Sequence, residues 1–182
     1  MPVKINAHKP EFNLREKLNR LDTERVPYER MPAGSVIQTQ FTRFDYVGTS
    51  NEFETTSSSY QATHFLVKIS PKFANSLIRF DAAVNIKQNT GGSYLRLALF
   101  RDIDGGGFSH FTGGTTGHGL ITYRITGATT AWDHTNFVCY DRPQTIKPIT
   151  YKLYLSNSDN SQNVRVGENG ATEFVSAMEI RQ

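Results

Sequence analysis

Two pairs of carboxylates have the spacing that acid chemistry or metal binding requires. Asp102 and Asp104 precede Gly105, and alternate aspartates followed by a glycine can offer several oxygens to Ca²⁺. The third acidic ligand and the distant glutamate of a helical calcium loop are missing. Glu52 with Glu54, or Asp102 with Asp104, could also form the carboxylate pair of a glycoside hydrolase. The alternative is solvated loop charge. We expect that alternative, with Asp102 and Asp104 kept only as weak metal candidates.

Other reactive side chains lack the partners that catalysis needs. Cys139 lies in an apolar stretch with no base beside it, which favours a small buried side chain over a nucleophile. No histidine belongs to an H-x-x-x-H pair or a Cys-x-x-Cys context. His110 and His118 flank a glycine-rich loop that could collect an ion on a trimer axis or could simply be solvated. The sequence therefore predicts a protein that is not an enzyme and has no cofactor.

Composition narrows the class of partner. The chain has 182 residues, a formal charge of +3 and 12% aromatic residues, and its basic residues are interleaved with acidic ones. Such a mixture suits contacts with proteins better than contacts with phosphate, so we expect no nucleic-acid partner. No apolar run approaches the roughly 20 residues that cross a bilayer, and no secretory h-region follows Met1. We expect a soluble protein that is made in a cytoplasm and does not insert into membranes.

The sequence changes character between Met31 and Pro32. Residues 1–32 are crowded with charge, whereas residues 33–182 read as short strands separated by Gly, Ser, Thr and Asn. We therefore predict two parts, an N-terminal attachment arm (1–32) and a β-domain (33–182). Within the arm, Asn13 and Glu16 form a capping-box pattern that predicts one short helix ending near Asp22. The residues expected to anchor the arm are Leu14, Leu18 and Leu21, which share one helix face, with Arg15 and Arg20.

From Ser35 onward the hydrophobic period is two. Between Leu77 and Lys87, apolar residues alternate with polar ones, which predicts a strand with one dry and one wet face. The same pattern predicts strands at 35–44, 65–69, 95–99, 120–125, 136–140, 149–155, 164–166 and 174–180. About eight to ten strands without a second helix indicate an antiparallel β-sandwich. We favour a jelly roll over an immunoglobulin-like sandwich, because the Cys, Trp, Cys pattern of the latter is missing.

Six aromatic residues lie in or beside loops rich in Gly, Ser and Thr. Such rings could stack on sugars while neighbouring hydroxyls bond to them. We favour the alternative, in which they fill the sandwich core or a seam between subunits, because the outward side of the strand around Leu97 is also apolar. The candidates for trimer seam or glycan contacts are Tyr94, Phe100, Phe108, Phe111, Trp132 and Tyr140.

The opening and the final third of the β-domain resemble jelly-roll domains of bacteriophage virion proteins. Pro32–Gln38 is similar to the entry into such a domain. The segments similar to its closing strands are Pro148–Leu155, Asn157–Ser161, Val164, Glu168–Gly170 and Val175–Ile180. Those domains are similar to the trimeric tumour-necrosis-factor and C1q type of sandwich. The resemblance implies a homotrimer, assembled in the host cytoplasm, that joins the virion by contacts of residues 1–32 with capsid or tail proteins.

Two placements on the particle follow from the resemblance. A capsid decoration or cement protein would sit on the shell with its arms spread over neighbouring subunits. A short tail fibre or receptor-binding protein would instead contact host surface glycans. The chain lacks the collagen-like, coiled-coil or repeat shaft of long fibres. We therefore expect capsid decoration first and the tail fibre as the alternative.

Overall fold

The computed structural model describes residues 27–45, 52–89, 94–111, 121–124, 130–158, 162–167 and 172–182. Within these residues almost all regular structure is strand. The elements are the 3-10 turn η2 (Tyr28–Arg30) and the strands β1 (Val36–Phe44), β2 (Phe53–Thr55), β3 (Gln61–Ile69), β4 (Leu77–Gln88), β5 (Tyr94–Ile103), β6 (Ser109–His110), β7 (Ile121–Arg124), β8 (Ala131–Asp141), β9 (Ile149–Asn157), β10 (Val164–Val166) and β11 (Glu173–Ile180). The helix predicted near residues 13–22 lies outside the described residues.

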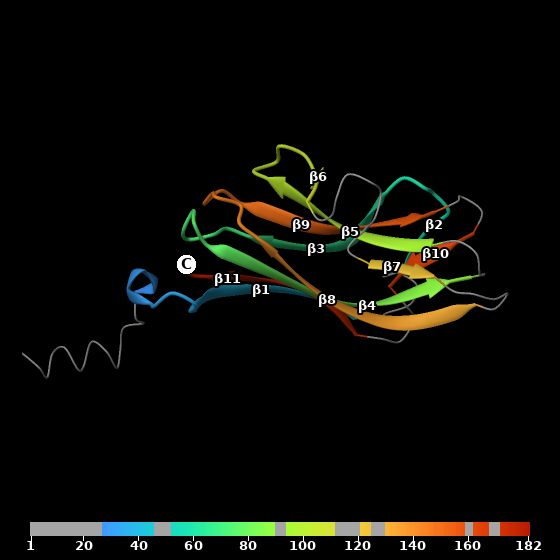
Figure 1. Cartoon of the computed structure of the whole chain (residues 1–182), viewed down its shortest axis with the longest axis horizontal. Coiled ribbons are helices and arrows are strands. Elements are labelled where there is room, and N and C mark those ends of the chain that lie inside the picture. Colours follow the sequence, from blue (N-terminus) through green and yellow to red (C-terminus); the bar gives the residue numbers. More distant parts are fainter. Residues whose placement is uncertain are drawn as a thin grey trace, which may run out of the picture.

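The strands form two antiparallel sheets that face each other as two layers (Figure 1). In the first sheet, called sheet A, β8 runs along one edge of β4, and β11 and β10 share the other edge. β1 extends this sheet beyond β11, and β2 extends it beyond β10. In the second sheet, called sheet B, β9 lies between β3 and β5, and β5 also pairs with β6 and β7.

The order in which strands pair is nested. β1 pairs with β11, β3 with β9, β4 with β8 and β5 with β7, so the chain folds back on itself from both ends toward the middle. A ribbon of antiparallel pairs wrapped into two sheets is the arrangement of a jelly roll. The prediction of an all-β, antiparallel jelly-roll sandwich is therefore confirmed.

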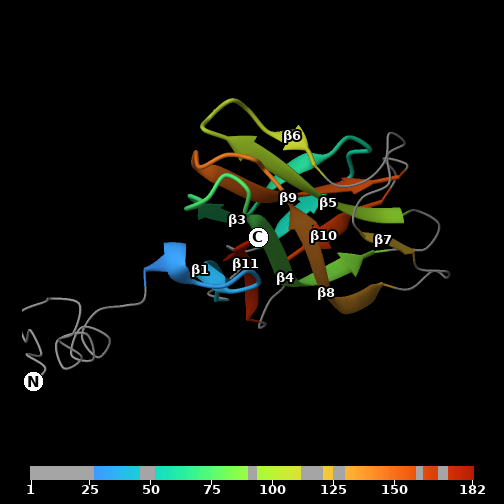
Figure 2. The same cartoon turned by 60° about the vertical axis from the view of Figure 1, so that its left-hand side comes forward.

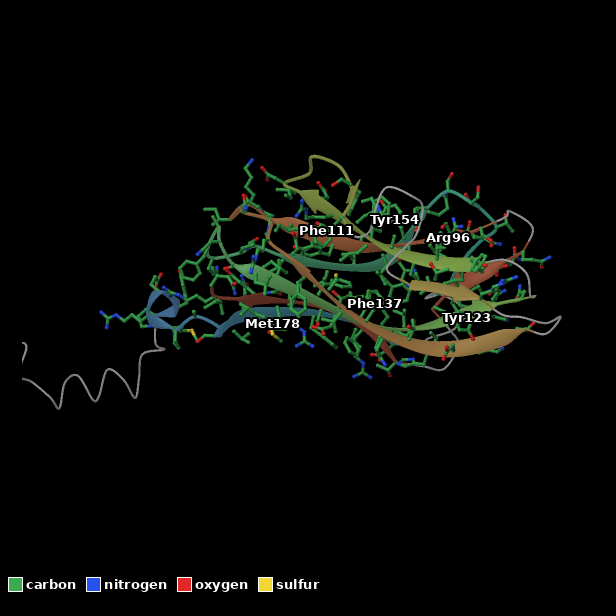
Figure 3. All side chains as sticks on the ribbon, viewed as in Figure 1. Arg96, Phe111, Tyr123, Phe137, Tyr154 and Met178 are labelled. Carbon is green, nitrogen blue, oxygen red and sulfur yellow. The ribbon has the colours of Figure 1, made fainter. Side chains whose placement is uncertain are left out.

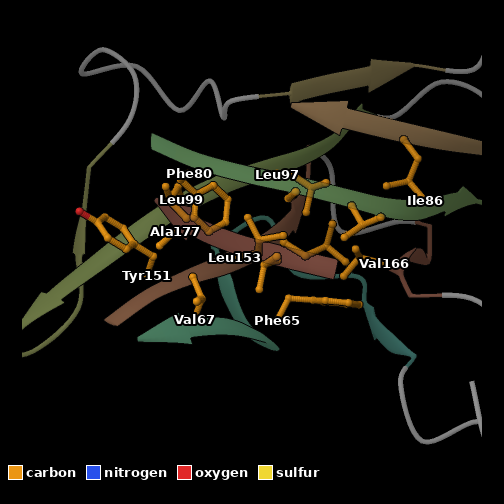
Figure 4. Packing of buried hydrophobic residues seen from close by; sticks show 14 of the residues in the cluster. Phe65, Val67, Phe80, Ile86, Leu97, Leu99, Tyr151, Leu153, Val166 and Ala177 are labelled. Carbon is orange, nitrogen blue, oxygen red and sulfur yellow. The ribbon is translucent and has the colours of Figure 1, made fainter. Parts of the chain in front are cut away.

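Alternation along the strands builds the core. On β4 the residues of one phase, from Ile78 to Ile86, are buried, and β5 and β9 contribute Leu95, Leu97, Leu99, Leu153 and Leu155 from the opposite sheet (Figure 4). Each fully buried aliphatic side chain contributes about 1.5–3 kcal/mol relative to an exposed one. The same alternation leaves the second phase of each strand on an outer face. Each sheet therefore has one face in the core and one that carries its other side chains outward.

A buried carboxylate ties the β3–β4 connection to the last strand. Glu179 on β11 accepts hydrogen bonds from the backbone N–H groups of Lys72 (2.8 Å) and Phe73 (3.1 Å) and from the hydroxyl of Ser76 (2.6 Å). Its other oxygen accepts a bond from Gln38 Nε2 on β1 (2.7 Å). A buried polar group is expensive unless it is bonded, and this one has four donors. The connection is therefore held in place at one end of the sandwich.

The described part of the arm packs against that same end (Figure 2). The ring of Tyr28 meets Phe73 edge-on with 5.6 Å between ring centroids, and Arg181 Nη1 donates to the Tyr28 carbonyl at 2.5 Å. The Arg181 guanidinium lies 4.9 Å from the Phe73 centroid, and Gly34 N–H donates to the Arg181 carbonyl at 2.8 Å. Residues 27–34 are thus fastened to the β-domain. Among the described residues no helix has the length and apolar character that a bilayer crossing needs.

Candidate functional site

The outer face of sheet A is the first candidate surface. Residues paired across an antiparallel sheet point to the same side, so the registers define rows that cross β1, β11, β4 and β8. One row contains Phe41, Ser176, Asp81 and Val138, and the adjacent rows contain Thr39, Met178, Arg79 and Tyr140, and Arg43, Phe174, Ala83 and Asn136. Phe137 lies on the opposite face, toward the core, while Met178 belongs to the outer rows (Figure 3).

Large side chains of this outer face are open to solvent. Phe41 is 57% exposed, Val138 47%, Tyr140 56% and Trp132 49%. They lie on β1 and β8. The strands between carry the small buried residues Ala83 and Ser176 and, beside them, Phe174, Met178 and the ion pair of Arg79 with Asp81. Phe41 also contacts Phe174, with ring centroids 5.5 Å apart. Exposed apolar groups gathered on one face are typical of a surface that another molecule covers.

The charged and polar side chains of this face contact partners within the chain. Arg79 Nη2 lies 2.7 Å from Asp81 Oδ1, and Lys87 Nζ lies 4.0 Å from the centroid of the Trp132 ring. His134 Nδ1 lies 2.7 Å from Asn85 Oδ1. Arg43 is paired with Asp45 at 2.5 Å, so Lys87, over its ring, is the cation of these strands' outer positions that has no carboxylate in contact in these pairs. Another surface of a second copy can approach such a face without strong repulsion.

The outer face of sheet B carries a different feature, a group of rings that we call the ring shelf. Its members are Tyr60, Phe100, Phe108, His110 and Tyr154. Phe100 on β5 stacks on Tyr154 of β9 with centroids 3.9 Å apart and contacts His110 of β6 at 5.1 Å. Tyr60 stacks on His110 at 5.7 Å, and Phe108 contacts Tyr154 at 6.0 Å. The shelf therefore joins residues from five places in the chain.

Between the two sheets, a polar cluster closes one side of the core. Arg101 Nη1 of β5 donates to both oxygens of Asp141 on β8, at 2.7 Å each, and the Tyr151 hydroxyl of β9 donates to Asp141 Oδ2 at 2.7 Å. In Figure 4 this hydroxyl lies at the margin of the packed side chains. Burial, reinforced by the charge of Asp141, raises the pKa of Tyr151 above its usual range. The cluster links strands of both sheets.

The cysteine beside this cluster is chemically quiet. Burial, followed by the charges of Asp141 and Asp81, raises the pKa of the Cys139 thiol to about 12. The reactive species of a cysteine is its thiolate, which is scarce at neutral pH when the pKa is so high. Its partly buried side chain packs against the core. Cys139 is therefore placed as a packing residue.

The carboxylates singled out in the sequence are engaged with other groups. Asp102 Oδ1 accepts the N–H of Gly107 at 2.9 Å, and Asp104 Oδ2 lies 2.9 Å from Lys147 Nζ. Glu52 and Glu54 both form ion pairs with Arg165. Across the described residues there is no group of three or more His, Cys, Asp or Glu side chains that could hold a metal ion. Asp102 and Asp104 thus serve the turn between β5 and β6.

The structure separates the six aromatic residues singled out in the sequence. Phe100 and Phe108 meet on the ring shelf through Tyr154, whereas Trp132 and Tyr140 lie at opposite ends of β8 on the outer face of sheet A. The other two are Phe111, which packs against the core cluster, and Tyr94, which contacts Arg124 at 5.0 Å near the far end of β5. The predicted anchoring residues, Leu14, Arg15, Leu18, Arg20 and Leu21, lie outside the described residues, as does His118.

Several residues of the two outer faces were missed by the sequence analysis. Tyr154 and Val138 occupy positions where the alternation of their strands calls for polar groups, and that mismatch is a signal that could have identified them. Phe41 and Phe174 become neighbours only through the pairing of the first and last strands. Tyr60 lies just before β3 and reaches the shelf from a loop. Only the topology brings these residues together.

Comparison with known proteins does not show a family for this chain. No protein-family model matches the chain, and no curated protein matches it. A solved structure described as the structure of infectious bursal disease virus Gx strain contains a similar chain, with a TM-score of 0.32 and 14% identity. The match covers 80% of this chain and 33% of that one, so the present chain spans about a third of its length. A match at this level does not establish a shared function.

Proposed function

We propose that this chain is a non-enzymatic structural protein of a bacteriophage virion. It forms a homotrimer through the outer face of sheet A, and residues 1–32 fasten it to the particle as a capsid decoration or cement protein. The observation that carries the proposal is the set of exposed apolar side chains on β1 and β8, which flank paired charges on one outer sheet face. The choice of a virion and of three copies rests on the sequence resemblance given above.

The size of the face supports self-association. β8 is 11 residues long. Since a strand rises about 3.4 Å per residue and neighbouring strands lie about 4.8 Å apart, four strands present roughly 600–700 Å². A stable interface buries about 800 Å² on each partner, which is of the same order. Its combination of aromatic and aliphatic side chains, with few unpaired charges, is typical of interfaces between subunits.

The fastening of residues 27–34 supports a role for the arm. Because Tyr28 is held by Phe73 and Arg181, the arm leaves the body from a fixed place near the C-terminal residue Gln182. Three arms that start at fixed places on a trimer can combine modest contacts into firm attachment. This arrangement suits a protein that spreads over a capsid surface.

Particle incorporation tests the proposal. The full-length chain carrying Leu14→Ser, Leu18→Ser and Leu21→Ser should keep the mass of a trimer and fail to join particles. A control with Asn19→Ser, about 140° around the predicted helix from Leu14, should be incorporated normally. Particles that lack the protein should lose resistance to heat and osmotic shock. Normal incorporation of the triple-leucine variant would refute the anchoring role.

The second candidate function is that of a short tail fibre or receptor-binding protein that contacts host glycans. The ring shelf favours it, because five rings gathered on an outer sheet face are not needed to fill the core. The two functions differ in a simple phenotype. Particles without a receptor-binding protein remain intact and fail to adsorb to cells, whereas particles without a cement protein adsorb and are fragile.

A further inference from the structure

The ring shelf lies on the solvent side of sheet B, where nothing in the sandwich requires it. Pairing registers place Phe100 beside Lys152 and His110, and Ala98 beside Tyr154, all on the outer phase of their strands. Ala98 is nevertheless fully buried, in keeping with the stacked rings of Phe100 and Tyr154 beside it. Phe108 keeps 38% of its surface exposed, and His110 is also exposed. Phe108 and His110 therefore keep part of their ring surface open to solvent.

The turn that carries Phe108 is fixed. Asp104, Gly105 and Gly107 have φ angles of 58°, 75° and 103°, in the left-handed region that glycine and aspartate tolerate. The Asp102 carboxylate accepts the Gly107 N–H, and Asp104 is held by Lys147. A side chain that is already positioned loses little conformational freedom when a ligand binds. Phe108 is thus presented to solvent from a prepared position.

Polar groups surround the open rings. Lys152 Nζ lies 5.6 Å from the centroid of Phe108, and the imidazole of His110 stacks on Tyr60. Burial, followed by the charge of Asp102, raises the pKa of the Tyr154 hydroxyl. The carboxylate of Asp102, the ammonium group of Lys152 and the phenol of Tyr154 therefore all lie near the open rings. The outer face of sheet A differs, because there aliphatic residues such as Val138 and Met178 accompany the rings. Aliphatic groups suit a protein partner, whereas rings edged by hydrogen-bonding groups suit a ligand with flat apolar faces and many hydroxyls.

We propose that the ring shelf binds a pyranose ring of a glycan. Phe108 and Tyr154 give the surface on which the C–H face of the sugar stacks, and Lys152 and His110 bond to its hydroxyls. The proposal rests on the second function above, receptor binding, and gives it a site and a ligand class.

Sugar titrations of the full-length protein test the site. The probes are methyl α-glucopyranoside, methyl α-galactopyranoside, N-acetylglucosamine and a purified bacterial O-antigen polysaccharide, each followed by saturation-transfer NMR. At least one should receive magnetisation from the protein. Phe108→Ala and Lys152→Met should each weaken its binding by about tenfold, the size expected for loss of one ring or one charged contact. Arg124→Met, on the same sheet beside the other end of β5, is the matched control and should bind as the native protein does.

The outcomes separate the site from the function. Binding that is unchanged in both shelf variants overturns the site while receptor binding stands. Absence of binding to every probe, with labelled native protein still adsorbing to cells that the particle infects, also overturns the glycan site and leaves the receptor function. Absence of both sugar binding and adsorption overturns the two together. Loss of sugar binding in the shelf variants, with circular dichroism and the Arg124→Met control unchanged, supports the proposal.

Discussion

Replacing Asp141 by asparagine should destabilise the sandwich more than any exposed charge replacement of the same kind. Asp141 is 5% exposed and accepts bonds from Arg101 and Tyr151, both at 2.7 Å. Removing one partner of a buried ion pair costs about 3–5 kcal/mol. The Arg101 side chain is 24% exposed, so water recovers part of that loss. We expect Asp141→Asn to lower the free energy of unfolding by about 2–3 kcal/mol.

Tyr151→Phe should cost less, about 1.5 kcal/mol, because the ion pair remains and only the hydroxyl bond to a charged group is lost. The double variant should be less destabilised than the sum of the two by about 1 kcal/mol, since both changes remove the same bond. The matched control is Asp104→Asn, which changes an exposed ion pair at a left-handed position that asparagine also tolerates. It should shift stability by less than about 0.5 kcal/mol.

The assay is urea unfolding followed by circular dichroism, at one fixed protein concentration because association also stabilises the folded state. In a thermal scan, Asp141→Asn should lower the Tm by about 4–12 °C, given roughly 2–4 °C per kcal/mol for a chain of this size. An Asp141→Asn protein that unfolds within about 0.5 kcal/mol of the native one would refute the view that this cluster holds the sheets together.

Three further predictions concern other contacts. Glu179→Gln should lower the free energy of unfolding by about 2 kcal/mol in the same assay, because an amide replaces a buried carboxylate that accepts four bonds; native-like stability would contradict this. The Cys139 thiol should react more slowly with disulfide reagents at pH 8 in the folded protein than in the urea-unfolded chain. Folding raises the pKa of this thiol from 9.0 to about 12, so its contribution to stability is present below pH 9 and is lost toward pH 12. Between these pH values Cys139→Ala should therefore lose less stability than the native protein does; equal loss in the two proteins would contradict the raised pKa. Arg181→Gln should speed tryptic cleavage after Arg30 by about fivefold, as expected for loss of about one hydrogen bond to Tyr28; unchanged cleavage would show that η2 is held by other contacts.

The core strands could be predicted from sequence because each repeats with period two. The strand predicted from Leu77 to Lys87 is observed as Leu77–Gln88, and the predicted 164–166 strand has the same bounds in the structure. β8 was predicted only from Asn136, yet it begins at Ala131. In its first half, Asp133 and Thr135 occupy the positions that face the core side of the sheet. This half therefore shows no alternation of apolar and polar residues from which a strand could be predicted. Pairing with β4 as far as Gln88 makes it a strand.

The candidate surfaces were less accessible to sequence reasoning. Composition near loops pointed to Phe100 and Phe108, but the same rule also selected Phe111, which packs against the core. The difference depends on which side of the sheet a residue at a strand end faces, and a one-residue change of register reverses that side. The shared face of Phe41 and Val138 depends on four strands from distant parts of the chain. Local patterns contain no record of such long-range pairing.

The mass of the full-length protein in solution, measured by sedimentation at micromolar concentration, tests the central claim that the outer face of sheet A joins copies of this chain. The native protein should sediment as three chains. Val138→Lys, which places a charge on that face opposite Asp81 of its own chain, should sediment largely as single chains. Ile146→Lys changes a residue that is 61% exposed and lies between β8 and β9, so it should remain trimeric. A native protein that sediments as a single chain, or a Val138→Lys variant that stays as trimeric as the native one, would contradict the account.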